Sequence, residues 1–323
     1  MDKTAAIPET LVDAIRFFSD PDKCLAFMVE LRWPNGVTCP TCGSRAVSFI
    51  STRRIWTCRE RHERRQFSVK VGTIFEDSPI PLDKWFAAMW LIASAKNGVS
   101  SYEVARGIDV TQKTAWFMLH RIRLSMQRGT FEKFSGEVEV DETFIGAKAR
   151  NMHRAKRARL VKGSGPFGSS KAAVLGILQR SPKKGESRVR LTVIDNIRTQ
   201  TLDPHVRKGV EPGSAVFTDA LSSYRKLGDV YGHETVDHAI EYVKGKVHTN
   251  GLENFWSLLK RCLKGTYVNV EPFHLFRYLD EQAFRFNTRK VKDGQRFAET
   301  LRSVVGKRLT YKGLTGKMAP ATT

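Results

Sequence analysis

The stretch GEVEVDETFIGAK, residues Gly136–Lys148, decides the fold of the larger part of this chain. Apolar and polar residues alternate along it, and this period of two predicts a β-strand. The alternation places Glu139 and Asp141 on one face of the strand and Glu142 on the other, where we expect a structural or supporting role for Glu142. Further strands are predicted in AAVLGILQR (172–180), SRVRLTVIDNI (187–197) and SAVFTDALSSY (214–224), with a helix in TLDPHVRKG (201–209).

The order of these elements indicates the type of sheet. Three consecutive strands, a helix and a fourth strand follow the order of an RNase H-like core. That core is an α/β fold, in which a mixed sheet is flanked by helices. We therefore expect an RNase H-like domain over residues 135–300.

Two aspartates stand at or near strand ends in this region. Asp141 lies in the middle or at the end of the first strand, and Asp219 ends the strand AVFTD. An acid at the end of a buried strand is costly unless it is paired or binds a cation. Two such acids from separate strands would meet over adjacent strand ends, which favours a metal site. For either aspartate alone, a turn or a helix cap is the alternative.

The stretch HTNGLENFWSLLKR, residues 248–261, offers a third acid. Asn250 and Glu253 have the spacing of a capping box, so one interpretation is simply the start of a helix. Lys260 follows Glu253 by two helical turns and therefore lies on the same helix face. An acid and a base on one face, beside a sheet that carries two aspartates, favour a metal site with an anchor for DNA phosphate.

The N-terminal part contains a predicted zinc ribbon. In VTCPTCGSRAVSF (37–49), Cys39 and Cys42 are spaced to reach one tetrahedral ion, and the alternating segments around them read as short strands. Cys58 supplies a third thiolate, and His62 is the nearest good fourth ligand. The alternatives are a redox Cys-x-x-Cys pair and, for His62, an ordinary surface histidine.

A helix-turn-helix is predicted between the ribbon and the sheet. PLDKWFAAMWLIASAKNG (81–98) forms one helix, and Ser100 and Glu103 open a second with a capping box. Gly107 is expected to stop that helix, and a third runs from about residue 109 or 111 to about 127. Side chains at or near the N-terminal end of the third helix are expected to contact DNA, namely Thr111, Gln112, Lys113 and Trp116. Arg121, further along the same helix, is also expected to contact DNA. An ordinary helical hairpin is the alternative.

The net charge of the chain indicates which class of partner it binds. Fifty-four Lys and Arg against 33 Asp and Glu give a formal charge of +21, spread over the whole length. Such a field favours nucleic acid, with a ribosomal or membrane-surface protein as the alternative. No apolar run approaches the roughly 20 residues of a membrane span, and the acidic, polar N-terminus is unlike a signal peptide. A cytoplasmic, nucleoid-associated bacterial protein is expected. Five cysteines, with one tight pair, favour a metal site over disulfides.

These motifs together resemble a known family. From about residue 8 to 295, CPTCGS, FSVKVGTIF, VEVDETFIGAK, VFTDALSSY and HTNGLENFWSLLKR are similar, in this order, to motifs of the DDE transposases of bacterial insertion sequences. The group is the one with an N-terminal zinc ribbon and a helix-turn-helix. The chain departs from that pattern at the zinc site, where the fourth cysteine is absent.

The resemblance implies a catalytic triad of Asp141, Asp219 and Glu253, followed by Lys260 as the basic residue. Two Mg²⁺ or Mn²⁺ ions about 3.5–4 Å apart would neutralise the phosphodiester and activate the attacking oxygen. Asp141 would bridge both ions, while Asp219 and Glu253 would each bind one. Additional roles are expected nearby: supporting or substitute ligands at Asn250, Glu142 and His248, and DNA contacts at Lys260 and Arg261.

The sequence thus predicts a multidomain α+β protein. We expect N-terminal helices and a zinc ribbon over 1–71, a helix-turn-helix domain over 72–134, the catalytic domain over 135–300 and a loose basic tail over 301–323. Such a transposase would act on double-stranded DNA at transposon ends and target, as a dimer or larger assembly. The alternative is a DNA-binding regulator with an inactive RNase H-like domain. The three acids, kept in a strongly basic chain, favour the enzyme.

Overall fold

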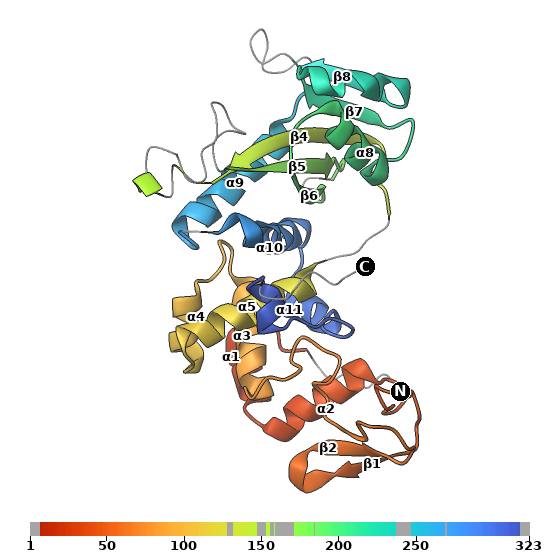
Figure 1. Cartoon of the computed structure of the whole chain (residues 1–323), viewed down its shortest axis with the longest axis vertical. Helices are drawn as coiled ribbons and strands as arrows, with labels where there is room; N and C mark the ends of the chain where they lie inside the picture. The colour runs from red at the N-terminus through yellow and green to blue at the C-terminus, as the bar shows by residue number, and fades with distance from the viewer. Residues whose placement is uncertain are drawn as a thin grey trace. The chain divides into compact units, whose positions relative to one another are not determined.

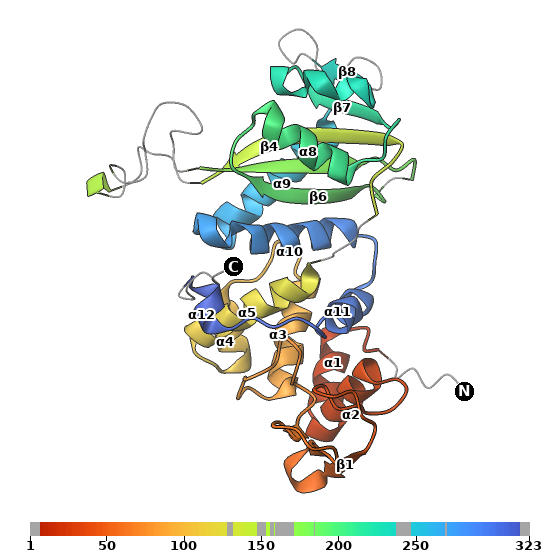
Figure 2. The same cartoon turned by 45° about the vertical axis from the view of Figure 1, so that its right-hand side comes forward.

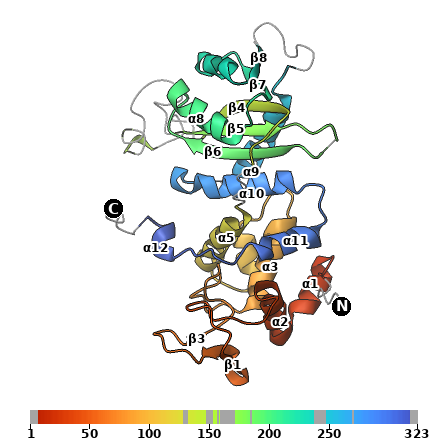
Figure 3. The ribbon, with the colours of Figure 1, turned by 90° about the vertical axis from the view of Figure 1, so that its right-hand side faces the viewer.

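A computed structural model of the chain describes residues 7–127, 132–146, 153–155, 158, 171–183, 185–236, 247–268 and 270–316 (Figure 1). The chain divides into two compact units. The first comprises residues 1–127 and 291–323, and the second comprises residues 128–290. The helices and strands of each unit can be followed from two further sides (Figure 2, Figure 3). Among the described residues, no helix has both the length and the apolar character needed to cross a membrane.

The first unit begins with two helices and a small sheet: α1 (Leu11–Phe18), α2 (Pro21–Arg32), β1 (Val47–Ile50), η1 (Ser51–Arg53), β2 (Ile55–Cys58) and β3 (Gln66–Phe67). Asp20 caps α2 through the backbone N–H of Asp22, and Pro21 occupies the first helical position, which does not need its missing N–H. The strands form an antiparallel sheet in the order β1-β2-β3. The predicted pair of helices and the short strands around the knuckle are therefore present.

Helices make up the rest of the first unit: α3 (Leu82–Ser94), α4 (Ser101–Ile108), α5 (Gln112–Met126), α11 (Asp293–Arg302) and α12 (Tyr311–Leu314). The predicted capping box of Ser100 and Glu103 opens α4. Gly107 does not stop this helix, which continues to Ile108 and ends at Asp109 in the left-handed conformation. Thr111 caps α5, so a turn of three residues separates the two helices.

The C-terminal segment belongs to this first unit, which differs from the predicted boundaries. Phe297, Leu301 and Val304 are buried, because they complete the apolar core around α3. Val305 pairs with Thr73, and the ammonium group of Lys307 donates to backbone carbonyls at the end of α5. Residues 301–316 are therefore packed rather than a loose tail, and residues 317–323 lie outside the described part of the chain.

The second unit is built on a five-stranded mixed sheet in the order β6-β5-β4-β7-β8. Its elements are β4 (Glu137–Ile145), β5 (Ala172–Gln179), β6 (Arg188–Ile194), α8 (Thr199–Gly209), β7 (Ala215–Asp219), η3 (Ser222–Asp229), β8 (Gly232–Val236), α9 (Asn250–Gly265), η4 (Pro272–His274) and α10 (Leu275–Asn287). The pairs β4–β5 and β5–β6 are antiparallel, whereas β4–β7 and β7–β8 are parallel. Apolar side chains of α8 and η3 pack on one face of the sheet, and those of α9 and α10 pack on the other. Figure 3 shows α8 and α10 on opposite sides of the sheet.

The register between β4 and β7 brings the two aspartates to the same level. Glu137 pairs with Ala215 and Glu139 with Phe217 in this parallel ladder. Continuing the register by two residues sets Asp141 opposite Asp219. A carboxylate from the middle of the sheet and one from a strand end therefore approach each other at the switch from antiparallel to parallel pairing.

Candidate active site and zinc centre

Asp141 lies on the face of β4 that α9 covers. Its Oδ2 atom accepts a hydrogen bond of 2.7 Å from the indole Nε1–H of Trp256. Burial raises the pKa of Asp141 to about 6, the indole N–H opposes this shift, and the nearby charges of Asp219 and Glu253 add to it. The three predicted acids thus lie close enough to influence one another.

Asp219 makes a local hydrogen bond at the end of its strand. One of its oxygens, Oδ1, accepts a hydrogen bond of 3.1 Å from the backbone N–H of Leu221. This is the local turn contact that an isolated aspartate would make. Its charge nevertheless acts on Asp141 and Glu142. The turn contact is therefore present, and it does not remove the effect of the Asp219 charge on the neighbouring carboxyls.

The spacing of Asn250 and Glu253 does not produce a capping box. Helix α9 begins at Asn250, so Thr249 is the N-cap, and no side chain of that residue caps the helix. The backbone N–H of Leu252 is instead satisfied by Glu139 Oε2 from strand β4, at 2.8 Å. Glu253 sits in the first turn with its side chain exposed. The capping-box interpretation of Asn250 and Glu253 is therefore wrong, although the helix does start at this point.

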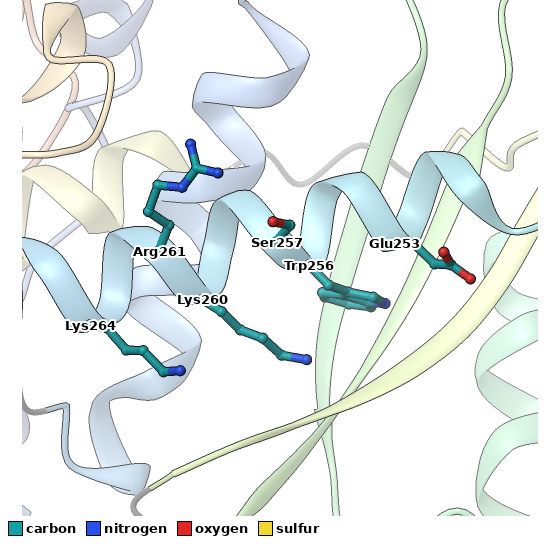
Figure 4. A pocket seen from close by; sticks show the side chains of 6 residues that line it. All are labelled: Glu253, Trp256, Ser257, Lys260, Arg261 and Lys264. Atoms are coloured by element: carbon teal, nitrogen blue, oxygen red, sulfur yellow. The ribbon is translucent and has the colours of Figure 1, made fainter.

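A basic groove continues from Glu253 along α9. It has a volume of about 510 Å³ and is lined by Glu253, Trp256, Ser257, Lys260, Arg261 and Lys264. Figure 4 shows Glu253, Trp256, Lys260 and Lys264 extending to the same side of the helix, while Arg261 points to the other. An exposed carboxylate whose charge acts on Asp141 is thus followed by ammonium groups about two and three helical turns further along.

The additional ligands proposed from the sequence take different places. Glu142 faces away from α9 and accepts a hydrogen bond from the Tyr224 hydroxyl. Burial raises the pKa of Glu142 to about 7, and the charges of Asp219 and Asp141 add to this shift. His248 contacts Arg180, whose Nη2 lies 2.7 Å from its Nδ1 atom. Asn250 is exposed at the first position of α9.

The donor chemistry around Asp141 fits a hard divalent cation. Carboxylate oxygens are the ligands that Mg²⁺ takes in proteins. Within the described chain, no ion pair joins Asp141 or Asp219 to a basic side chain, so a bound cation would supply the missing positive charge. Their oxygens and those of Glu253 do not form a group within 4.8 Å of one another. Mutual repulsion of like charges is consistent with this spacing.

Burial of Asp141 predicts a pH dependence of folding stability. The folded chain retains the Asp141 proton up to a pH of about 6, whereas the ordinary pKa is 3.8. Because the folded state binds more protons between these values, this carboxyl lowers the free energy of unfolding as pH rises through that window. Without added divalent cation, Asp141→Asn should therefore gain melting temperature over the unaltered chain as pH rises, and keep the gain at neutral pH. A difference that is the same at every pH, like that of the exposed control Asp195→Asn, would contradict the assignment.

The four predicted zinc ligands converge. Cys39 Sγ lies 3.4 Å from His62 Nε2, and Cys42 Sγ lies 3.7 Å from Cys58 Sγ. All four ligand atoms lie within 4.8 Å of one another. With Zn–S bonds of about 2.3 Å, a tetrahedral site separates its sulfurs by roughly 3.8 Å. Burial opposes ionisation of Cys39, but hydrogen bonds from the backbone N–H groups of Cys42 and Thr41 and from the thiols of Cys42 and Cys58 lower its pKa to about 7. This shift favours the metal-binding thiolate.

The candidate DNA contacts on α5 divide into two groups. Thr111 and Lys113 are exposed at its N-terminal end, and the Lys113 ammonium group lies 5.0 Å from the ring centre of Tyr311. Gln112 is partly buried and donates to Ser101 Oγ at 2.8 Å. Trp116 is partly buried against the ring of His120. These four residues lie within two turns of the helix start.

Arg121 belongs to the interior, which corrects its predicted role in DNA contact. Its side chain is 4% exposed, and its guanidinium donates to the backbone carbonyls of Ile74, Glu76 and Leu309. A guanidinium has five N–H donors and no acceptor, and three of these donors bond the carbonyls here. Arg121 therefore joins three segments of the first unit and is not available to DNA.

Comparison with known proteins gives two family matches. Residues 133–287 match the model of the ISXO2-like transposase domain, and residues 19–62 match that of a transposase zinc-ribbon domain. An uncharacterized protein in transposable element ISH50 of Halobacterium salinarum is 28% identical over 268 residues, which cover 77% of this chain and 85% of that protein. An uncharacterized transposase-like protein of Haemophilus influenzae is 34% identical over 107 residues, which cover 32% of this chain and 85% of that protein. No solved structure matches the chain.

Proposed function

Because the chain belongs to the insertion-sequence transposases with an N-terminal zinc ribbon, we propose that it binds the ends of its element and catalyses Mg²⁺-dependent cleavage and strand transfer of DNA. One observation carries the proposal: Asp141, Asp219 and Glu253 come from two strands and a helix far apart in the sequence, yet the charges of Asp219 and Glu253 both act on the buried carboxyl of Asp141. Without a bound cation, such an arrangement of like charges is costly.

The sheet supports an RNase H-like interpretation of the second unit. Its order, β6-β5-β4-β7-β8, combines three antiparallel strands with two parallel ones and has helices on both faces. Asp141 belongs to the central strand, Asp219 ends its parallel neighbour, and Glu253 begins the helix that covers them. These positions support the proposed catalytic domain.

The proposed chemistry uses the triad as the cation site. Asp141, Asp219 and Glu253 would hold Mg²⁺, which when bound neutralises phosphate oxygens and activates the attacking oxygen. The Trp256 indole bonds Asp141 Oδ2, which sets the orientation of the carboxylate toward the proposed cation. Glu253 is exposed in the groove, where it can reach a cation that DNA also contacts. Hydrolysis and strand transfer can then use the same site, since both are displacements at phosphorus and need no covalent protein intermediate.

The groove on α9 is proposed to bind the DNA backbone next to the scissile phosphate. Lys260 and Lys264 follow Glu253 on one side of the helix, so phosphates can lie along ammonium groups that begin at the site (Figure 4). Arg261 is proposed to contact a neighbouring phosphate from the other side of the helix. Lysine binds phosphate as a point charge and adds little sequence preference.

Replacing Lys260 by Ala is expected to weaken DNA binding about equally for all sequences and to lower the slope of log K against log salt by about one. Filter binding or fluorescence anisotropy at several salt concentrations measures this slope. Lys208→Ala removes an exposed lysine on α8, which covers the opposite face of the sheet, and serves as the matched control. Equal slopes for the two variants would rule out a phosphate contact at Lys260.

Recognition of the element's ends is proposed for the helix pair α4 and α5. The turn of three residues and the exposed N-terminal side chains of α5 support a helix-turn-helix, with base contacts from Thr111, Lys113 and Trp116. Gln112 donates a hydrogen bond to Ser101, and part of its proposed contribution to end recognition comes from this contact. Because a transposase of this kind acts on two ends, we also propose a dimer or larger assembly on DNA.

A plasmid assay tests the proposed function. A supercoiled plasmid that carries the gene with its native flanking DNA is incubated with the purified chain and Mg²⁺, and strand breaks are mapped. Discrete breaks at the element's ends, absent when Mg²⁺ is omitted, are expected. If the chain binds the ends but cuts them with neither Mg²⁺ nor Mn²⁺, the alternative of a DNA-binding regulator is favoured instead.

A further inference from the structure

We infer that Trp256 and Glu139 are positioning residues that fix the carboxylates of Asp141 and Glu253 for the cation. The inference rests on the proposed function, because it concerns residues that act through two members of the triad. Neither residue is proposed to touch DNA or the cation. The observations are the two hydrogen bonds that join helix α9 to strand β4, termed here the β4–α9 contacts.

The first β4–α9 contact orients Asp141. Trp256 is 4% exposed, and its indole N–H, which can only donate, bonds Asp141 Oδ2. The ring lies directly on β5 at Gly176, where an added Cβ would stand 2.6 Å from ring atom Cζ2. Real Cβ atoms do not approach so closely, so the ring seat requires a glycine. With its ring held in this way, Trp256 fixes Oδ2 and thereby sets the orientation of the whole carboxylate.

The second β4–α9 contact fixes the start of the helix. Glu139 is 1% exposed, and its Oε2 accepts the backbone N–H of Leu252 at 2.8 Å. Its Oε1 accepts Arg180 Nε at 2.7 Å, so the buried carboxylate is paired. A carboxylate at a helix N-terminus satisfies a free N–H and is favoured by the helix dipole. At Gly251 an added Cβ would lie 2.8 Å from Glu139 Oε2, so glycine is needed for the approach.

The spacing of the two contacts determines where Glu253 stands. Two residues of strand, from Glu139 to Asp141, span about 6.6 Å. Four residues of helix, from Leu252 to Trp256, span about 6 Å. The contacts therefore match in length, and together they prevent α9 from sliding along β4. Glu253 lies between them on the helix and is held at a set height above Asp141.

Replacing Trp256 by Phe tests the first contact, because it removes the N–H and keeps an aromatic ring. The readout is direct binding of Mn²⁺ to the full, zinc-loaded chain without DNA, measured from the free-ion signal by electron paramagnetic resonance. We expect affinity to fall by about 10–100-fold, the usual effect of removing a group that orients a metal ligand. Trp90→Phe, at a buried tryptophan of the first unit, is the control for the same substitution elsewhere.

Replacing Gly251 by Ala tests the second contact, because helix propensity alone and the inference predict different effects on the melting temperature. Alanine is a much better helix former than glycine. If Gly251 only helped to start the helix, the variant would melt at a higher temperature and bind Mn²⁺ unchanged. The inference predicts weaker Mn²⁺ binding and no gain in melting temperature, since the new methyl group must push Glu139 away. Gly265→Ala is the matched control on the same helix, because an added Cβ there meets nothing within 4 Å.

The outcomes separate the inference from the proposed function. Mn²⁺ binding by the unaltered chain that is lost in Asp141→Asn establishes the cation site. If Trp256→Phe and Gly251→Ala then bind Mn²⁺ as tightly as the unaltered chain, the positioning role is overturned while the proposed function stands. If the unaltered chain binds no more Mn²⁺ than Asp141→Asn, the cation site fails, and the inference fails with it.

Discussion

Replacing Asp141 by Asn should abolish strand cleavage, with a loss of at least about 10³-fold, the upper end of what removing one charge-stabilising group costs. Asparagine keeps the size of the side chain and still offers an oxygen to the Trp256 indole, so the sheet and α9 should remain as they are. What is lost is the negative charge at the centre of the proposed cation site. Single-turnover cleavage of end-containing DNA measures the loss of catalysis. A gel-shift measurement shows whether DNA binding is retained.

The fold is not expected to suffer from this substitution. The Asp141 carboxylate is desolvated, so removing its charge should raise stability at neutral pH. Inactivity caused by unfolding is therefore excluded if Asp141→Asn melts at or above the temperature of the unaltered chain. Asp195→Asn, at an exposed aspartate that directly follows β6 in the same sheet, should cleave normally. Cleavage by Asp141→Asn at a rate near that of Asp195→Asn would contradict the assignment.

Loss of zinc should unfold the ribbon of the first unit. Three short strands bury too little apolar surface to be stable alone, whereas a structural zinc ion contributes about 10–16 kcal/mol of apparent binding free energy. We expect one zinc per chain by metal analysis, and loss of this zinc in Cys58→Ser. Limited proteolysis should then cut within β1–β3. Cys24→Ser and Cys262→Ser remove buried cysteines outside the cluster and should keep the metal.

The histidine ligand can be tested separately from the cysteines. His62→Cys restores the four-cysteine pattern of the family and should retain zinc, while His62→Ala should lose it or bind it more weakly. Such a result would explain the absent fourth cysteine, since the histidine takes its place at 3.4 Å from Cys39 Sγ. Full zinc affinity in His62→Ala would mean that another group or water completes the site.

Local sequence patterns predicted much of this fold, because the structures they indicate depend on interactions between neighbouring residues. The alternation in residues 136–148, the capping box at Ser100 and the Cys-x-x-Cys knuckle each depend on a few neighbouring residues. The nearness that lets the Asp219 charge act on Asp141 was also predictable, because acids near buried strand ends need a partner and these two strand ends are neighbours. The order of strands around β4 then fixes which strand ends become neighbours.

What the sequence did not predict depends on contacts between distant residues. Arg121 looked like an exposed base on a recognition helix, but carbonyls from Ile74, Glu76 and Leu309 surround it. The N–H contact of Trp256 depends on Gly176, which is remote in sequence. The sequence does indicate that Glu139 shares the strand face of Asp141. Residue spacing alone could not identify its hydrogen-bond partner on α9.

The most direct test of the account compares Glu253→Gln with Asn250→Ala in the plasmid assay. Both residues lie in the first turn of α9, and either could be the third ligand of the proposed cation site. The account predicts that Glu253→Gln abolishes the breaks at the element's ends, whereas Asn250→Ala only weakens them. If Glu253→Gln still cuts and Asn250→Ala does not, the triad proposed here is wrong.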